Sequence, residues 1–470
     1  MNEKRVDVAI IGAGSAGLYA LGKVRASGKR FVLINGGDTG TTCARVGCMP
    51  SKAMIQVAED YHRRGILGRY GVTGQEELQL DSEEAMEHVR TLRDTFVDRV
   101  LSNSTDKMDA ELFIEGYARF IDPHTLEVAG QRIHAERIII ATGTRPLIPA
   151  AWQAFGERIV TTDQIFELEQ LPATMAVVGL GVIGLELGQA LARLGVQVTG
   201  FDMLETIGGL DDPDVAKAAI DALTKDFPIH LGMAAEISEE NGKLRVTAGN
   251  HSVLVDKVLA SLGRRPNLEH LALENAAIEL GANGIPQFNP NTMQLGSSHI
   301  FLAGDVTGER ALLHEAGDEG RIAGHNASSD RVSAFKRKVP LSINFCDPNI
   351  CHVGARWSEL DAESTAVGVV NFAPVGRALI MGKNRGILKV YADKVSGRLL
   401  GSEMACTKGE NLAHLLAWSI QQQLTVGDLL QMPFYHPVIE EALQAALYDC
   451  YAKVERKNTG GIVELVSLVQ

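Results

Sequence analysis

The chain contains few cysteines, no excess of positive charge and no long apolar run. Six cysteines among 470 residues are too sparse for the disulfide framework of a secreted scaffold. A formal net charge of -13 argues against a nucleic acid or a membrane surface as partner, because either requires a basic face. No apolar run approaches the roughly 20 residues that span a bilayer, and "MNEKRVDVAIIGAG" lacks the apolar core of a secretory signal. We therefore expect a cytoplasmic protein, in which a close cysteine pair is catalytic or metal-binding.

A glycine motif occurs twice, each time between an apolar strand pattern and a helical pattern. In G-x-G-x-x-G, the first glycine permits a tight turn, the second lets the backbone approach a pyrophosphate, and the third lets the helix pack against the strand. Two turns that only pack are the alternative interpretation, but two copies in this context favour two dinucleotide sites. The copies consist of Gly12, Gly14 and Gly17 in "VDVAIIGAGSAGLYAL", and of Gly179, Gly181 and Gly184 in "MAVVGLGVIGLELGQAL".

The residue that ends the next strand differs between the two copies. After the second copy, "VQVTGFD" ends at Asp202, eighteen residues beyond Gly184. A carboxylate there accepts hydrogen bonds from ribose hydroxyls and repels a 2′-phosphate, so it favours NAD over NADP. After the first copy, "RFVLINGG" ends at Asn35, which can bond a ribose only without charge.

Cys43 and Cys48 lie in "TTCARVGCMPSK", just after the strand that ends at Asn35. On an ideal helix, residues at this spacing have Cα atoms roughly 8 to 9 Å apart, which exceeds the limit of about 7 Å for a disulfide. A disulfide therefore requires a distorted turn, for which Gly47 and Pro50 provide the means. A zinc site would need a second ligand pair, and none is convincing.

The segment "GTTCARVGCMPSK" closely resembles the redox-active segment of the class I pyridine nucleotide–disulfide oxidoreductases. Further motifs that resemble this family follow in order: "IIIATGTRP" (138–146), "GLGVIGLE", "SLGRRPN" (261–267), "IFLAGDVTG" (300–308) and "FYHPVIEEAL". The resemblance implies an α/β fold with two Rossmann-like dinucleotide-binding domains, glutathione-reductase-like, and an α+β C-terminal dimerisation domain. The implied boundaries are 1–148 for an FAD domain, 149–268 for an NAD domain, 269–338 for a central segment completing the FAD domain, and 339–470 for the interface domain.

The resemblance also implies which residues bind the cofactors FAD and NAD. Lys52 would lie beside the flavin ring, paired with Glu186 of the second glycine motif, and Asp305 would bond the ribityl chain. The other FAD residues implied, beyond the first three glycines, are Asn35, Gly116, Thr142, Gly143, Thr144, Leu313 and His314. For NAD they are Gly179, Gly181, Gly184, Asp202 and Gly263.

The implied mechanism uses four residues. Cys48 would exchange electrons with the flavin, while Cys43 would perform thiol–disulfide interchange with the substrate. Only a thiolate attacks a disulfide well, so Cys43 needs a base, and His436 has a pKa suited to that task. Glu441 would orient His436, with Pro437 expected in the first turn of the following helix. In the family this pair comes from the other subunit, which implies a homodimer.

A second cysteine pair, Cys346 and Cys351 in "FCDPNICHV", has the same spacing. A metal site or a second redox pair is conceivable, but no flavin motif adjoins it. Buried thiols that pack as small hydrophobes are the preferred interpretation, and no metal site is predicted.

The leading functional prediction is an enzyme similar to dihydrolipoyl dehydrogenase, passing electrons from a dihydrolipoyl group through Cys43, Cys48 and FAD to NAD⁺. The implied partners are a small-molecule or lipoyl-domain dithiol, a second copy, and a 2-oxoacid dehydrogenase or glycine cleavage complex. Two alternatives stay open, because "CARVGC" and "HPVIEE" depart from the usual forms. One is an NADH-dependent reductase of another low-molecular-weight disulfide. The other is a non-catalytic flavoprotein assembly subunit.

Overall fold

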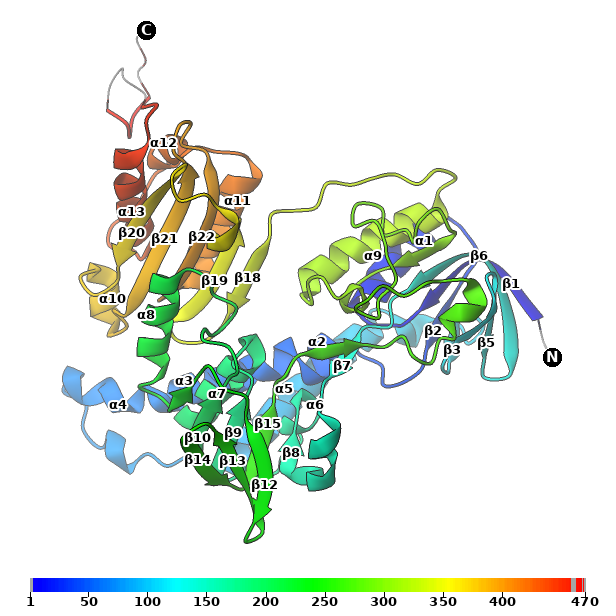
Figure 1. The fold of residues 1–470 in the computed structure, drawn as a ribbon, viewed down its shortest axis with the longest axis horizontal. Coiled ribbons are helices and arrows are strands. Elements are labelled where there is room, and N and C mark those ends of the chain that lie inside the picture. Colours follow the sequence, from blue (N-terminus) through cyan, green and yellow to red (C-terminus); the bar gives the residue numbers. More distant parts are fainter. Residues whose placement is uncertain (1–2, 458–461, 467, 469–470) are drawn as a thin grey trace.

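A computed structural model describes residues 3–457, 462–466 and 468. Figure 1 shows three lobes: the first sheet lies near the N-terminus, the second below it, and the third near the C-terminus. An extended segment, residues 329–340, crosses from the first lobe to the third. No described helix is both long and apolar enough to cross a membrane.

The first sheet has seven strands with β1 near its centre. β1 pairs in parallel with β2 and β6, β3 and β17 pair in parallel with β2 and β6 respectively, and β4 and β5 add an antiparallel hairpin. β17 comes from a distant part of the chain and completes this sheet. The strands are β1 (Glu3–Ile11), β2 (Phe31–Asn35), β3 (Phe113–Glu115), β4 (Arg119–Asp122), β5 (Thr125–Val128), β6 (Gln131–Ile140) and β17 (Ile300–Leu302).

Two helices pack against each other on this sheet (Figure 1), α1 (Ser15–Ala26) and α9 (Leu313–Ser328). Their close approach depends on glycines in α9. A Cβ at Gly320 would lie 2.2 Å from the Ala16 carbonyl oxygen, and one at Gly324 would lie 2.5 Å from that of Ala20. The second half of β1, Val8 to Ile11, is apolar and continuously buried, which fits a strand covered on both faces.

The second lobe repeats the parallel arrangement. Its five-stranded sheet has the order β11-β10-β9-β15-β8, and α7 (Val182–Arg193) follows β9. A three-stranded antiparallel meander lies beside it. The strands are β8 (Ile159–Val160), β9 (Thr174–Val178), β10 (Gln197–Phe201), β11 (Ile229–His230), β12 (Glu236–Glu240), β13 (Lys243–Ala248), β14 (His251–Val255) and β15 (Lys257–Ala260).

The third lobe has an antiparallel five-stranded sheet of order β18-β19-β22-β21-β20. Helices α11 (Gly409–Gln421) and α13 (Glu440–Lys453) pack on it. The strands are β18 (Leu341–Asn344), β19 (Asn349–Gly354), β20 (Thr365–Asn371), β21 (Gly386–Asp393) and β22 (Leu399–Cys406). The predicted fold class, two parallel α/β units followed by an α+β unit, is confirmed.

Long helices join the lobes. α3 (Cys48–His62) and α5 (Ser82–Ser102) lie between β2 and β3 in the chain, and one apolar cluster contains residues of both, of α7 and of the third sheet. Outside the sheets already described, β7 (Thr144–Pro146) pairs with β16 (Arg264–Pro266). The remaining helices are α2 (Thr42–Val46), α4 (Arg64–Leu67), α6 (Thr162–Ile165), α8 (Pro213–Leu223), α10 (Gly376–Met381) and α12 (Val426–Leu430). The 3-10 turns are η1 (Gly68–Tyr70), η2 (Gln75–Glu77), η3 (Thr105–Lys107), η4 (Ala150–Arg158), η5 (Leu273–Ala276), η6 (Asp305–Thr307) and η7 (Trp357–Glu359).

Candidate active site

Both glycine motifs form the turn between a parallel strand and the N-terminus of a helix, α1 or α7. Gly12 has a φ of 111°, and a Cβ there would lie 2.3 Å from the Ala141 carbonyl oxygen. A Cβ at Gly17 would lie 1.8 Å from the Gly12 carbonyl oxygen, so only glycine lets α1 approach its strand. At Gly14 a Cβ would meet nothing within 4 Å, which leaves the face above the turn open.

The residues that end β2 and β10 contact these turns directly. Asn35 accepts a hydrogen bond from the Ala13 amide at 3.0 Å and donates one to the Gly37 carbonyl at 2.8 Å. Asp202 accepts from the Leu180 amide at 2.6 Å and from the Leu204 amide at 2.9 Å. Each side chain thus braces the glycine turn of its own unit, a role that the strand-end argument did not anticipate.

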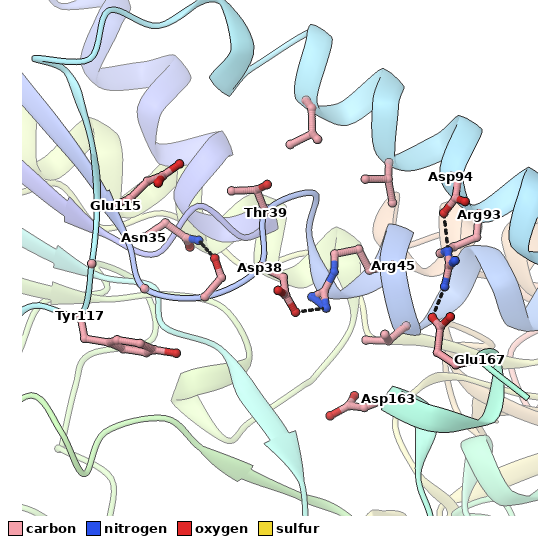
Figure 2. Close-up of a pocket in the computed structure, with 16 residues that line it drawn as sticks. Asn35, Asp38, Thr39, Arg45, Arg93, Asp94, Glu115, Tyr117, Asp163 and Glu167 are labelled. Carbon is pink, nitrogen blue, oxygen red and sulfur yellow. Dashed lines mark hydrogen bonds and ion pairs between the residues drawn. The ribbon is translucent and has the colours of Figure 1, made fainter.

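A cavity of about 700 Å³ opens beside Asn35 (Figure 2). Its walls come from the end of β2, the loop after β3, α2, α5 and the segment around α6. Within it Arg45 pairs with Asp38, and Arg93 pairs with Asp94 and Glu167. Gly116 lines the cavity and donates its backbone amide to the Asn35 carbonyl at 2.8 Å.

The first lobe fits FAD, by three observations on its residues. The Gly12–Gly17 turn is a cradle that a Cβ would fill, and the neighbouring cavity is large enough for an adenosine group. The Oγ1 atom of Thr142 is buried without a hydrogen-bond partner among the described residues, as expected of a group that bonds a ligand. Burial raises the pKa of Asp305, and Arg264 and the Thr144 hydroxyl, 3.4 Å from it, oppose this shift.

Arg264 and Asn267 of "SLGRRPN" hold the turn at Thr142–Thr144, although no role was predicted for either residue from the sequence. Arg264 donates to the Thr144 hydroxyl at 2.7 Å and to its carbonyl at 2.8 Å. Asn267 donates its side-chain amide to the Thr142 carbonyl at 3.0 Å and its backbone amide to the Gly143 carbonyl at 3.0 Å. Gly263 has a φ of 98° and accepts from the Leu147 amide at 3.0 Å.

The redox segment is distorted where the sequence suggested. α2 ends at Val46 and α3 begins at Cys48, with Gly47 between them at φ -129° and ψ -117°. The Thr41 hydroxyl caps α2 by accepting from the Ala44 amide at 3.3 Å. The break places the two free thiols close enough to shift each other's pKa, which a continuous helix would not allow.

The two thiols differ in acidity. The pKa of Cys48 is lowered to about 7, chiefly by the hydrogen bond from Cys43 and in part by the Lys52 ammonium, against the opposing effect of burial. The same hydrogen bond, followed by burial, raises the pKa of Cys43. In the reduced pair Cys48 therefore carries the thiolate, and Cys43 needs a base before it can act as a nucleophile.

Lys52 forms the ion pair with Glu186 that the resemblance implies. Its Nζ lies 2.6 Å from Glu186 Oε2, and the Glu186 side chain is only 4% exposed. Phe345, which the sequence argument missed, donates its backbone amide to Glu186 Oε1 at 2.9 Å and places its ring 4.6 Å from Lys52 Nζ. No local signal marks this residue, because it is 159 positions from Glu186 in the chain.

His436 and Glu441 lie together but apart from the cysteines. His436 Nδ1 is 2.8 Å from Glu441 Oε1, and the His436 side chain is 81% exposed. In Figure 1, α13, whose first turn contains Glu441, lies at the far side of the third lobe from α2. One prediction is wrong: Pro437 precedes the helix, which begins at Glu440, because Val438 donates its amide to Glu441 before the first helical turn forms.

The remaining sequence candidates are also placed. Leu313 and His314 are exposed at the N-terminus of α9, and Asp305 follows β17 at the same end of the sheet. Cys346 and Cys351 are each 1% exposed, and burial raises the pKa of both thiols, which agrees with a packing role. Among the described residues no group of three or more His, Cys, Asp or Glu side chains could hold a metal ion.

Family models account for most of the chain. Residues 6–320 match the pyridine nucleotide-disulphide oxidoreductase model, and residues 341–447 match the dimerisation domain of the same family. The chain therefore belongs to the pyridine nucleotide–disulphide oxidoreductase family, a class of FAD-dependent enzymes that use a nicotinamide nucleotide.

Individual relatives are similar over nearly the full length. The chain is 30% identical to the dihydrolipoyl dehydrogenase of Thermus scotoductus, over 94% of this chain and 97% of that protein. It is 28% identical to a mercuric reductase of Staphylococcus aureus, over 94% of this chain and 81% of that protein. The solved structure of the HOCl-induced flavoprotein disulfide reductase RclA of Escherichia coli superposes with a TM-score of 0.83 at 24% identity, over 95% and 99% of the chains, and so supports the fold.

Proposed function

We propose that the protein is a dihydrolipoyl dehydrogenase, which oxidises a dihydrolipoyl dithiol and reduces NAD⁺. The observation that carries this proposal is the arrangement of Cys43, Cys48, Lys52 and Glu186, in which two thiols of unequal acidity lie beside an ion pair whose carboxylate is buried. The relative at 30% identity supports the substrate class, and Asp202 supports NAD over NADP.

The chain's own residues account for the thiol chemistry. A thiolate of the substrate attacks Cys43 Sγ of the Cys43–Cys48 disulfide, and Cys48 leaves as a thiolate. The second substrate thiol, deprotonated, then attacks the mixed disulfide, which releases the cyclic disulfide product and Cys43. Two electrons have passed from substrate to cysteine pair. Bound FAD, held by the first lobe, supplies the relay of these electrons to NAD⁺, and the Lys52 ammonium stabilises the Cys48 thiolate meanwhile.

The base in this scheme is His436 of the partner subunit, in a homodimer. Within the chain the net shift of the Cys43 pKa is upward, although the Cys48 backbone and the Lys52 ammonium oppose it. The chain's own His436 bonds Glu441 and does not contact the cysteines. Glu441 orients the imidazole through Nδ1, which leaves Nε2 for proton transfer. The match of residues 341–447 to a dimerisation domain supports this arrangement.

Two other functions fit the same site less well. A reductase of another low-molecular-weight disulfide would run the same steps in reverse from NADH, and relatives with other names at 28% identity keep that alternative open. A non-catalytic assembly subunit would have no need of the unequal thiols. A cytoplasmic location and membership of a 2-oxoacid dehydrogenase or glycine cleavage complex belong to the proposal as well.

The deciding experiment measures NAD⁺ reduction by the purified flavoprotein with dihydrolipoamide, against NADH oxidation with glutathione disulfide. Rapid NADH formation with dihydrolipoamide would support the proposal. Cys43→Ser should abolish it while keeping FAD bound, and Cys346→Ser is the matched control because that thiol is buried away from substrate. A yellow protein that is inactive with dihydrolipoamide but active with another disulfide would favour the reductase.

A further inference from the structure

A second, smaller cavity lies where α3, α7 and the third lobe meet. Its volume is about 80 Å³, compared with about 700 Å³ for the cavity beside Asn35. We propose that this junction cavity binds one small oxyanion, of the size and charge of inorganic phosphate. The residues that matter are His62 and Arg63 at the end of α3, Arg193 at the end of α7, and Asp347, Lys383 and Arg385 from the third lobe.

The acidic groups at this junction are already paired. Asp347 lies 3.2 Å from Arg193 and 3.3 Å from Lys383. Glu59 pairs with Lys383, and Asp226 lies 3.1 Å from Arg193. These ion pairs hold the three elements together and leave no carboxylate free to neutralise a further cation in the cavity wall.

Two guanidinium groups remain without such partners. Arg63 and Arg385 are exposed at the mouth of the cavity, and within the described part of the chain neither side chain has a hydrogen bond or an ion pair. Guanidinium groups bind phosphate through parallel, charge-assisted hydrogen bonds. The neighbouring His62 has a lowered pKa, first because of burial and then because of Arg193. A tetrahedral oxyanion supplies the missing negative charge, whereas a nucleoside would not fit the volume.

The junction cavity is separate from the cysteines, but two helices, α3 and α7, run from one to the other. α3 carries Lys52 near its start and His62 at its end, which puts roughly 15 Å of helix between them. α7 likewise carries Glu186 in its first half and Arg193 at its last position. An anion bound here would therefore brace the far ends of both helices that provide the Lys52–Glu186 pair.

The test is calorimetric titration of the FAD-loaded protein with inorganic phosphate, with NAD⁺ saturating so that its site is occupied. We expect saturable binding of one phosphate per chain and a raised melting temperature. The double variant Arg63→Gln, Arg385→Gln should lose at least about tenfold in phosphate affinity. Arg64→Gln is the matched control, because Arg64 is the next residue but its guanidinium already bonds the Tyr61 carbonyl at 2.9 Å.

Three outcomes would overturn the proposal: no saturable binding, equal affinity in the double variant, or equal loss in the control. The lysine variant Arg63→Lys, Arg385→Lys keeps the two charges but not the parallel guanidinium hydrogen bonds, so its phosphate affinity should lie between those of the wild type and the glutamine variant. The readout is phosphate binding and not turnover, so failure here is distinguishable from failure of the proposed enzymatic function.

Discussion

The two glycine turns of this chain exclude a side chain at the same positions and for the same reason, the closeness of a backbone carbonyl oxygen. A Cβ at Gly12 would lie 2.3 Å from the Ala141 oxygen, and one at Gly179 would lie 2.4 Å from the Ser261 oxygen. The corresponding distances at Gly17 and Gly184, to the first glycine's oxygen, are 1.8 and 1.9 Å. The shared cradle is thus a property of the backbone, which two different cofactors can use.

The side chains around the two turns differ, and these differences are the basis of the roles that we propose for the two units. The strand-end residue is the amide Asn35 in the first unit and the carboxylate Asp202 in the second. Two residues after the third glycine stands Tyr19 in the first unit, under the Arg321 guanidinium, and Glu186 in the second, paired with Lys52. The redox segment therefore follows the first unit, directly after β2, and Glu186 of the second unit forms an ion pair with Lys52 of that segment.

The largest effects are expected from variants that disrupt one glycine turn and leave the other intact. Gly17→Ala should abolish FAD binding and most folded protein, because the added methyl group would overlap the Gly12 carbonyl. Gly184→Ala should leave the protein yellow but remove NADH binding. The flavin-to-protein ratio from the absorbance spectrum and an NADH titration measure the two effects.

A control for these variants lies in the same helix. Gly22 is exposed in α1, and a Cβ there would meet nothing within 4 Å. Gly22→Ala should therefore bind FAD normally and gain about 0.5 to 1 kcal/mol of stability, since alanine favours a helix interior. Loss of FAD from Gly184→Ala instead would show that the two cradles are not independent.

The next prediction tests Lys52, which forms the ion pair between the redox segment and Glu186 of the second unit. Lys52→Met should raise the pKa of Cys48 from about 7 by roughly one unit, because the thiolate loses a neighbouring positive charge. The pH dependence of alkylation of the reduced protein, followed at Cys48 by peptide mapping, gives the value. Lys217→Met removes an exposed ammonium from α8 and should change nothing. An unshifted profile in Lys52→Met would contradict the assigned thiolate.

A smaller effect concerns the strand-end residues. In Asp202→Asn the amide nitrogen would face the Leu204 or the Leu180 amide, so one hydrogen bond is lost along with the charge. We expect NADH affinity to fall about tenfold and the preference for NADH over NADPH to narrow. Binding titrations with both nucleotides measure this. Asn35→Asp should weaken FAD binding and not NADH binding, because a carboxylate cannot donate to the Gly37 carbonyl as the Asn35 amide does. The reverse result would refute the division of roles.

Much of this comparison was predictable from the sequence because it depends on local backbone chemistry. The glycine spacing predicted both turns, and Gly47 within "CARVGC" predicted the break that brings Cys43 and Cys48 together. Family resemblance predicted the Lys52–Glu186 pair, although 134 positions separate the two residues. Residue roles toward FAD, NAD and a second subunit stay predictions.

What the sequence could not predict depends on contacts between lobes. Phe345 and the free guanidinium groups of Arg63 and Arg385 have no motif, because their neighbours come from distant parts of the chain. The helix expected at Pro437 starts three residues later, because the Glu441 carboxylate bonds the Val438 amide and the His436 ring. Such choices among competing hydrogen-bond partners are settled only by the folded arrangement.

The loops that follow Asn35 and Asp202 also contact different parts of the molecule. The first carries the cysteines, whereas the second docks on the third lobe through Glu403. That carboxyl accepts the backbone amides of Asp211 at 3.3 Å and of Asp212 at 3.0 Å. Its other oxygen and Asp211 Oδ1 are buried, and no donor group among the described residues reaches either atom, so the two carboxyl groups face each other. Lys389 and Tyr391 are already engaged by Asp212.

One proton must therefore be shared between the two carboxyl groups. Burial, followed by the hydrogen bond with Asp211, raises the pKa of Glu403 to about 8. Although burial opposes it, hydrogen bonding from Glu403 and Ser358 lowers the pKa of Asp211 to about 2. The nearby His352 stays neutral, since burial and Arg356 lower its pKa to about 4.

The smallest expected effect is a pH dependence of stability at this contact. Between about pH 4.5 and 8 the folded protein holds a proton on Glu403 that the unfolded chain has released, so the free energy of unfolding falls as pH rises through this window. Glu403→Gln, which still donates to Asp211, should remove this slope and reduce the loss between pH 5 and 8 by about 1 to 3 kcal/mol. Denaturant unfolding at both pH values measures it, with the exposed Glu363→Gln as control. Parallel slopes in wild type and Glu403→Gln would mean that the two carboxyl groups share no proton, and that Glu403 contributes to this contact only by accepting the two backbone amides.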